Sequence, residues 1–77
     1  MSKILIVDDD EAIRNLIAVY LENEGLQTRK AEDAVVAMQL LEESDFDLVI
    51  LDIMMPRMDG IEACIKIRQE RNMPIIM

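Results

Sequence analysis

Two short runs of branched apolar residues, each followed at once by aspartate, constrain the fold of this chain more than any other feature. The runs are KILIV, from Lys3 to Val7, and DLVIL, from Asp47 to Leu51. Because neither run alternates between polar and apolar positions, both are typical of strands covered on two faces, as in a parallel sheet. A charge at the end of such a strand is costly unless something pairs with it. Asp52 must therefore cap a helix, bind a metal ion or take part in a chemical reaction.

A helical pattern follows the first of these strands. The spacing predicts a helix from Glu11 to Asn23, with Gly25 in ENEG as its C-terminal stop. Its apolar residues recur every three or four positions, so they share one face. They are Ile13, Leu16, Ile17, Tyr20 and Leu21.

The rest of the chain continues the alternation of strand and helix. Leu26 to Ala31 is polar and basic, as an edge strand can be, and Asp33 is a candidate N-cap of a second helix. A third helix is predicted around Ile61, and a fourth strand from Pro74 to Met77. The order β-α-β-α-β-α-β with short connections predicts one α/β domain, with a parallel sheet and helices on its faces. The apolar positions of the second and third helices are Ala34, Ala37, Met38 and Leu41, and Ile61, Cys64 and Ile65.

Composition narrows the classes of partner. The chain has 77 residues, a formal net charge of -8, no histidine, and only Tyr20 and Phe46 as aromatic residues. Nucleic acids and anionic membranes are bound largely through clustered Lys and Arg, so neither is expected as a direct partner. No apolar stretch approaches the roughly 20 residues of a membrane span. Cys64 is the single cysteine and is interpreted as a buried packing residue in a reducing compartment, so we expect a cytoplasmic protein.

Acidic residues after the first and third predicted strands form the candidate site. Asp8 to Asp10 follow the first strand and Asp52 follows the third. In a parallel sheet these ends lie at one edge, where ligands of α/β proteins bind, so the carboxylates can meet. Converging carboxylates repel unless a cation neutralises them, and oxygen ligands without histidine or thiolate favour Mg²⁺ or Mn²⁺. The alternative is that the aspartate run only caps the following helix, a role that needs one aspartate at most.

Two other acidic motifs are excluded. An EF-hand loop beginning at Asp8 would need an oxygen ligand and then a glycine where the chain has Ala12 and Ile13. A phosphatase with an aspartate nucleophile would carry a second aspartate two residues after Asp52, where Met54 stands.

Three motifs together resemble the receiver domain of two-component response regulators of the transcription-factor type. They are ILIVDDD at the first strand, LVILDIMMPRMDG at the third and PIIM at the fourth. The resemblance covers the whole chain without an insertion. It implies a flavodoxin-like (CheY-like) parallel sheet with strand order 2-1-3-4. It also implies a phosphoacceptor that takes a phosphoryl group from a sensor histidine kinase or a small acyl phosphate, and that is not a turnover enzyme.

The resemblance also implies the roles of individual residues. Asp52 matches the phosphoacceptor, whose carboxylate forms an aspartyl phosphate. Asp9 matches the direct ligand of a Mg²⁺ cofactor, and Asp8 the neighbour that binds the ion through water. Met54 matches the residue whose backbone carbonyl completes the protein ligands, while Asp10 has no part in the site and is interpreted as a cap. The loop that shapes the family site is matched by Met55, Pro56, Asp59 and Gly60.

Residues 1–77 match about the N-terminal two thirds of such a domain, without its fourth and fifth helices, its fifth strand or an output domain. The family's phosphoryl-contacting Ser or Thr and Lys would fall after Met77.

We expect Pro74 to Met77 to form an exposed apolar edge and the first helix to lack a neighbour. The chain is therefore expected to form a homo-oligomer through its fourth strand or by exchanging elements. An alternative function is a self-associating assembly module without phosphotransfer.

Overall fold

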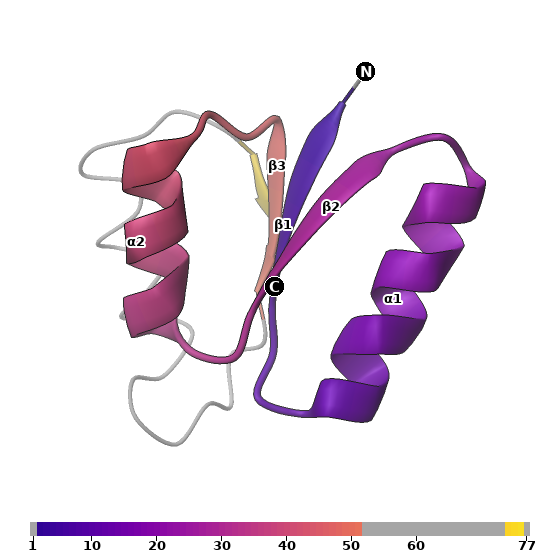
Figure 1. Ribbon diagram of the computed structural model, residues 1–77, viewed down its shortest axis with the longest axis horizontal. Coiled ribbons are helices and arrows are strands. Elements are labelled where there is room, and N and C mark those ends of the chain that lie inside the picture. Colours follow the sequence, from indigo (N-terminus) through magenta and orange to yellow (C-terminus); the bar gives the residue numbers. More distant parts are fainter. Residues whose placement is uncertain (1, 52–73, 77) are drawn as a thin grey trace.

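A parallel sheet with a helix on each face forms the described part of the chain (Figure 1). The computed structural model describes residues 2–51 and 74–76. The predicted third helix, with Ile61, Cys64 and Ile65, and the loop from Met54 to Gly60 lie outside them. The elements are β1 (Lys3–Val7), α1 (Glu11–Asn23), β2 (Gln27–Ala31), α2 (Ala34–Glu43), β3 (Leu48–Leu51) and β4 (Ile75–Ile76).

The strand order is β2-β1-β3-β4, and every pair is parallel. This confirms the predicted order 2-1-3-4 and the predicted edge position of the basic strand β2. Figure 1 shows α1 on one side of the sheet and α2 on the other. Strand β1 is buried on both faces from Ile4 to Val7, whereas β3 is buried on the α2 side and only half-buried at Leu48 and Ile50 on the α1 side. Burial on both faces agrees with the absence of polar alternation in KILIV.

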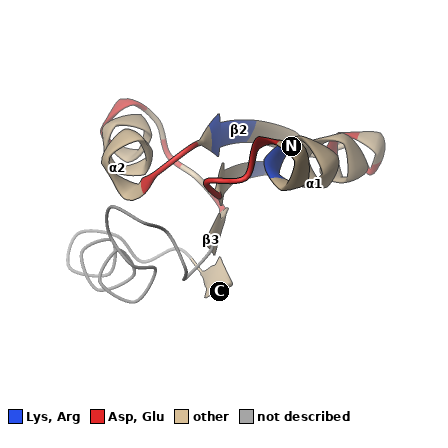
Figure 2. Ribbon diagram, turned by 90° about the horizontal axis from the view of Figure 1, so that it is seen from below, with Lys and Arg blue, Asp and Glu red and all other residues tan. Residues whose placement is uncertain are grey.

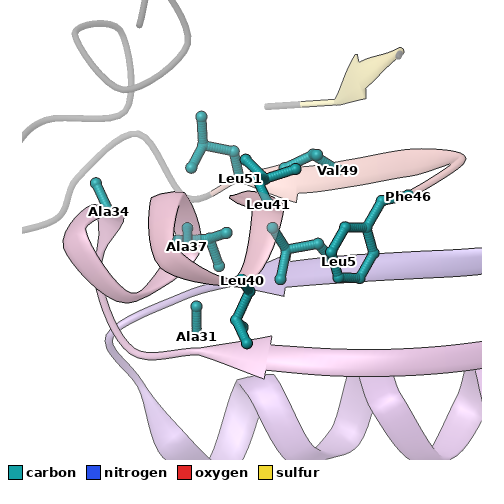
Figure 3. Close-up of a cluster of buried hydrophobic side chains, with 10 residues drawn as sticks. Leu5, Ala31, Ala34, Ala37, Leu40, Leu41, Phe46, Val49 and Leu51 are labelled. Atoms are coloured by element: carbon teal, nitrogen blue, oxygen red, sulfur yellow. The ribbon is translucent and has the colours of Figure 1, made fainter. Parts of the chain in front are cut away.

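The larger hydrophobic cluster lies between the sheet and α2 (Figure 3). Leu5 and Val49 from the central strands are fully buried in it, and Phe46 closes it just before β3. Its other members are Val7, Ala31, Ala34, Ala37, Leu40, Leu41 and Leu51. Ala34 and Ala37 of α2 lie in this cluster with Ala31 of β2, and the short helix α2 is stabilised mainly by this packing.

The opposite face of the sheet packs against α1 through a smaller cluster of Ile4, Ile6 and Ala18. Ile17 and Leu21 pack against this cluster, but three members of the predicted apolar face do not lie in it. Exposed fractions are 47% for Ile13, 70% for Leu16 and 66% for Tyr20. Among the described residues, only part of that face is thus covered by the sheet.

Local chemistry explains where α2 begins and where α1 ends. Asp33 is the N-cap of α2 and accepts a hydrogen bond from the Val36 N–H at 2.9 Å. Gly25, just beyond the end of α1, has φ of 86°, a left-handed conformation that costs other residues about 1–2 kcal/mol. Within the described ranges, none of the helices is long and apolar enough to cross a membrane.

Candidate functional site

The C-terminal ends of β1 and β3 lie side by side. The register pairs Val7 with Leu51, the last residues of the two strands. Asp8 leaves the sheet directly after Val7, and Asp52 follows Leu51 in the sequence but lies outside the described residues. Figure 2 looks at this edge of the sheet and shows acidic segments leading into α1 and α2. The run Asp8 to Asp10 therefore begins at the C-terminal edge of the sheet, which is the edge predicted for the site.

Asp8 is held through its backbone and its side chain. Its N–H donates to the Ala31 carbonyl at 3.1 Å, which extends the contact of β1 with β2 by one residue. Its Oδ1 accepts the Asp10 N–H at 2.8 Å. Its carbonyl oxygen accepts a hydrogen bond from Nη1 of Arg14 at 2.7 Å. The turn from strand to helix is thus held by hydrogen bonds at the N–H, the carbonyl oxygen and Oδ1 of Asp8.

Asp10 has the capping role that the sequence predicted for one aspartate of the run. Its Oδ1 accepts hydrogen bonds from the Ala12 N–H at 2.9 Å and the Ile13 N–H at 3.2 Å. It is the N-cap of α1, so its carboxylate satisfies two N–H groups that no helical carbonyl reaches. Capping alone therefore explains Asp10 but leaves Asp8 and Asp9 to be explained.

Asp9 is exposed at this edge and takes no part in capping. Its carboxylate and that of Asp8 are hard oxygen donors, which suit Mg²⁺ better than a soft metal. Among residues 2–51 and 74–76, no three metal-binding side chains gather at one place. The predicted Asp52 and Met54 lie outside those ranges, so the complete ligand set stays a prediction. The donor type fits Mg²⁺, which is commonly held by one or two carboxylates and water.

Arg14 is a residue of this edge that the sequence reasoning missed. It is half-buried, it is the only cationic residue of α1, and it donates a hydrogen bond to the Asp8 carbonyl from the first turn of that helix. An open cavity of about 390 Å³ lies beside it, and two of the residues that line it are joined by the 2.9 Å hydrogen bond from Nζ of Lys30 to Oδ1 of Asn15. The cavity is lined by Glu11, Arg14, Asn15, Lys30, Glu32 and Val36. The sequence signal that could have indicated this contact is the position of Arg14, about one helical turn after the run Asp8 to Asp10.

Comparison with known proteins identifies the family. The family described as "Response regulator receiver domain" matches residues 4–77. The transcriptional regulatory protein ResD of Bacillus subtilis is 46% identical over 76 residues, which are 99% of this chain and 32% of ResD. The transcriptional regulatory protein SrrA of Staphylococcus aureus is 41% identical over 76 residues, which are 99% of this chain and 32% of SrrA. The chain thus spans about a third of the length of these relatives.

Solved structures give the same result. The response regulator TrrA of Thermotoga maritima, in complex with Mg(2+)-BeF, has a TM-score of 0.93 and 38% identity, and the match covers 100% of this chain and 68% of TrrA. A complex of the histidine kinase ThkA with TrrA matches with a TM-score of 0.92 and 38% identity, covering 97% of this chain and 66% of the matched chain. The chemotaxis protein CheY4 of Vibrio cholerae has a TM-score of 0.94 and 32% identity, covering 97% of this chain and 65% of CheY4. These likenesses, with the strand order of the sheet, confirm the flavodoxin-like fold. The chain belongs to the receiver domain family of two-component response regulators.

Proposed function

We propose that this chain is the phosphoacceptor of a two-component signalling system, and that Asp52 receives the phosphoryl group. Mg²⁺ would be held by the carboxylates of Asp9 and Asp52, by Asp8 through water, and by the backbone carbonyl of Met54. The observation that carries the proposal is the register of Val7 with Leu51. It brings the ends of β1 and β3 together, and each is followed in the sequence by a candidate carboxylate.

The transfer forms one bond and breaks one bond. A carboxylate oxygen of Asp52 attacks the phosphorus, and the phosphorus bond to the donor's leaving atom breaks, so the donor leaves with the electron pair. That leaving atom is the nitrogen of a phosphohistidine or the oxygen of an acyl phosphate. When bound, Mg²⁺ neutralises charge on the phosphoryl oxygens. The chain's own part is to hold Asp8 and Asp9 at the strand edge while the aspartyl phosphate forms.

The donor is proposed to be a sensor histidine kinase or a small acyl phosphate. Support for a kinase comes from the matched complex of the histidine kinase ThkA with TrrA. Support for Mg²⁺ comes from the TrrA complex with Mg(2+)-BeF and from the oxygen donors of Asp8 and Asp9. The chain therefore acts as an acceptor whose phosphorylation it assists itself, in a cytoplasmic signalling pathway that regulates transcription.

Acetyl phosphate tests the proposal without a kinase. The chain is incubated with acetyl phosphate and Mg²⁺, and intact-mass spectrometry follows the gain of one phosphoryl group. We expect a gain in the unmodified chain, no gain with EDTA, and no gain in the Asp52→Asn variant. A folded chain that gains no phosphoryl group, or a D52N variant that gains as much as the unmodified chain, contradicts the proposal.

Self-association without phosphotransfer is the second candidate function, and exposed apolar side chains favour it. Ile76, on the outermost strand of the described sheet, is 54% exposed, and Leu16 on α1 is 70% exposed. Pairing through β4 or exchange of elements between two copies would bury such surface. Light scattering at micromolar concentration tests this: a dimer or larger species supports it, and a stable monomer contradicts it.

A further inference from the structure

We propose that Arg14 is a positioning residue for the magnesium site, and that it acts by fixing the peptide between Asp8 and Asp9. The inference rests on the proposed function, because it concerns the same Mg²⁺. The juxtaposition that carries it is the 2.7 Å hydrogen bond from Nη1 of Arg14 to the Asp8 carbonyl oxygen.

The peptide unit explains how this bond reaches Asp9. The Asp8 carbonyl and the Asp9 N–H belong to one planar group, so holding the carbonyl fixes the direction in which the chain leaves Asp8. The other side of Asp8 is already held, because its N–H donates to the Ala31 carbonyl at 3.1 Å. With both peptides fixed, the Cα of Asp9 has little freedom to move relative to β1. The carboxylate of Asp9 is then presented from a defined point at the sheet edge.

The position of Arg14 on α1 makes this contact possible. Ile17 and Ala18, which pack towards the sheet, lie three and four residues after Arg14 and therefore on the same side of the helix. The Arg14 N–H also donates to the Asp10 carbonyl at 2.9 Å, so the residue is anchored in the first turn. A half-buried guanidinium that donates to a carbonyl makes one of the stronger hydrogen bonds in proteins.

The contact differs from simple charge neutralisation in a way that can be measured. The guanidinium of Arg14 donates to the backbone carbonyl of Asp8, and this bond occupies no carboxylate oxygen of Asp8 or Asp9. As a mere nearby positive charge, Arg14 would repel Mg²⁺, and its removal would strengthen metal binding. As a positioning residue, its removal would weaken metal binding. The two roles therefore predict opposite signs.

The experiment is a titration of the whole chain with MgCl₂, followed by the backbone amide signals of Asp8 and Asp9 in NMR spectra. Arg14→Met removes the charge and the donors while keeping an unbranched side chain. Arg14→Lys keeps the charge and one donor group. Arg29→Met is the matched control, because Arg29 is an exposed arginine on β2 and its loss changes the net charge equally.

We expect R14M to raise the Kd for Mg²⁺ about tenfold or more, the range found when a group that orients a metal ligand is removed. R14K should restore part of the affinity, and R29M should stay within about twofold of the unmodified chain. In metal-free buffer, R14M should also shift the Asp9 amide signal, and R29M should not.

Two failures can be told apart. If the unmodified chain shows no saturable response to MgCl₂, the proposed function is wrong and the role of Arg14 with it. If the unmodified chain binds Mg²⁺ and R14M binds it equally well or more tightly, the role of Arg14 alone is overturned. Should R14M not fold, Arg14→Gln is used instead, because its side chain is shorter and uncharged. The same changes in the Kd for Mg²⁺ then support or overturn the role of Arg14.

Discussion

Replacement of the α1 cap separates capping from metal binding within the aspartate run. Asp10→Ala removes the Oδ1 that accepts from the Ala12 and Ile13 N–H groups at 2.9 and 3.2 Å. Because both bonds are exposed, water replaces the acceptor in part, and the loss is that of an ordinary N-cap. We expect unfolding to become easier by about 1 kcal/mol, which lowers Tm by roughly 4–8 °C in a domain of this size. Asp10→Asn keeps an acceptor and should lose only a few tenths of a kcal/mol through the helix dipole.

The assay is urea unfolding followed by far-UV circular dichroism, in EDTA and again in MgCl₂. Asp9→Asn is the control, since Asp9 is the adjacent exposed aspartate that does not cap. In EDTA, D9N should not be destabilised, because it removes a charge from an acidic edge. In MgCl₂, D10N should keep the stabilisation that the ion gives to the unmodified chain, and D9N should lose it.

Two results would contradict these roles of Asp9 and Asp10. If D10A is as stable as the unmodified chain within about 0.3 kcal/mol, the bonds of Asp10 do not stabilise α1. If D10N loses the response to Mg²⁺ as completely as D9N does, Asp10 is a ligand and its assignment as a cap only is wrong.

Three further changes test the fold. Leu5→Ala, at a fully buried site of β1, should cost about 2–5 kcal/mol by urea unfolding, and a loss below about 1 kcal/mol would contradict the central place of Leu5 in the core. Gly25→Ala should cost about 1–2 kcal/mol through its φ of 86° alone, since a Cβ there meets nothing within 4 Å; an unchanged midpoint in thermal unfolding would contradict this. Leu16→Glu, at a site that is 70% exposed, should change stability by less than about 0.5 kcal/mol, and any self-association that light scattering detects should weaken if α1 carries it.

The bounds of the elements near the sequence signals were predictable because local chemistry sets them. Helix α1 runs from Glu11 to Asn23 as predicted, since Asp10 caps its start and Gly25 ends it. Strand β3 begins at Leu48 and not at Asp47, whose N–H bonds the Lys3 carbonyl at 2.8 Å. One residue of difference at a strand end is within the usual scatter of such boundaries.

The orientation of α1 was less predictable than its length. Helical spacing groups Ile13, Leu16 and Tyr20 with Ile17 and Leu21, but it does not say which part of a wide apolar face meets the sheet. The structure turns the side with Ile17, Ala18 and Leu21 inwards, because those residues reach Ile4 and Ile6. The same rotation brings the side of the helix that bears Arg14 towards the strand end, which no periodicity of apolar residues could indicate.

The sequence predicted at which edge of the sheet the candidate site lies, but not the hydrogen bonds that hold its residues. The convergence of the strand ends follows from parallel pairing, and the register of Val7 with Leu51 confirms that β1 and β3 end together. The cap role predicted for Asp10 is confirmed by its bonds to the Ala12 and Ile13 N–H groups, whereas the bond from Arg14 to the Asp8 carbonyl was not predicted. The part of the site carried by Asp52 and Met54 lies outside the described residues and stays a prediction.

The carboxylates after β1 and β3 are proposed to share one site, and a double-mutant cycle of Asp9 and Asp52 measures whether they interact. The free energy of unfolding is measured in metal-free, low-salt buffer for the unmodified chain, D9N, D52N and the double variant. If the two carboxylates converge, each single change relieves repulsion, and the double change stabilises by about 1–2 kcal/mol less than the sum of the singles. Effects that add within about 0.5 kcal/mol would show that Asp9 and Asp52 do not meet, and would contradict the account.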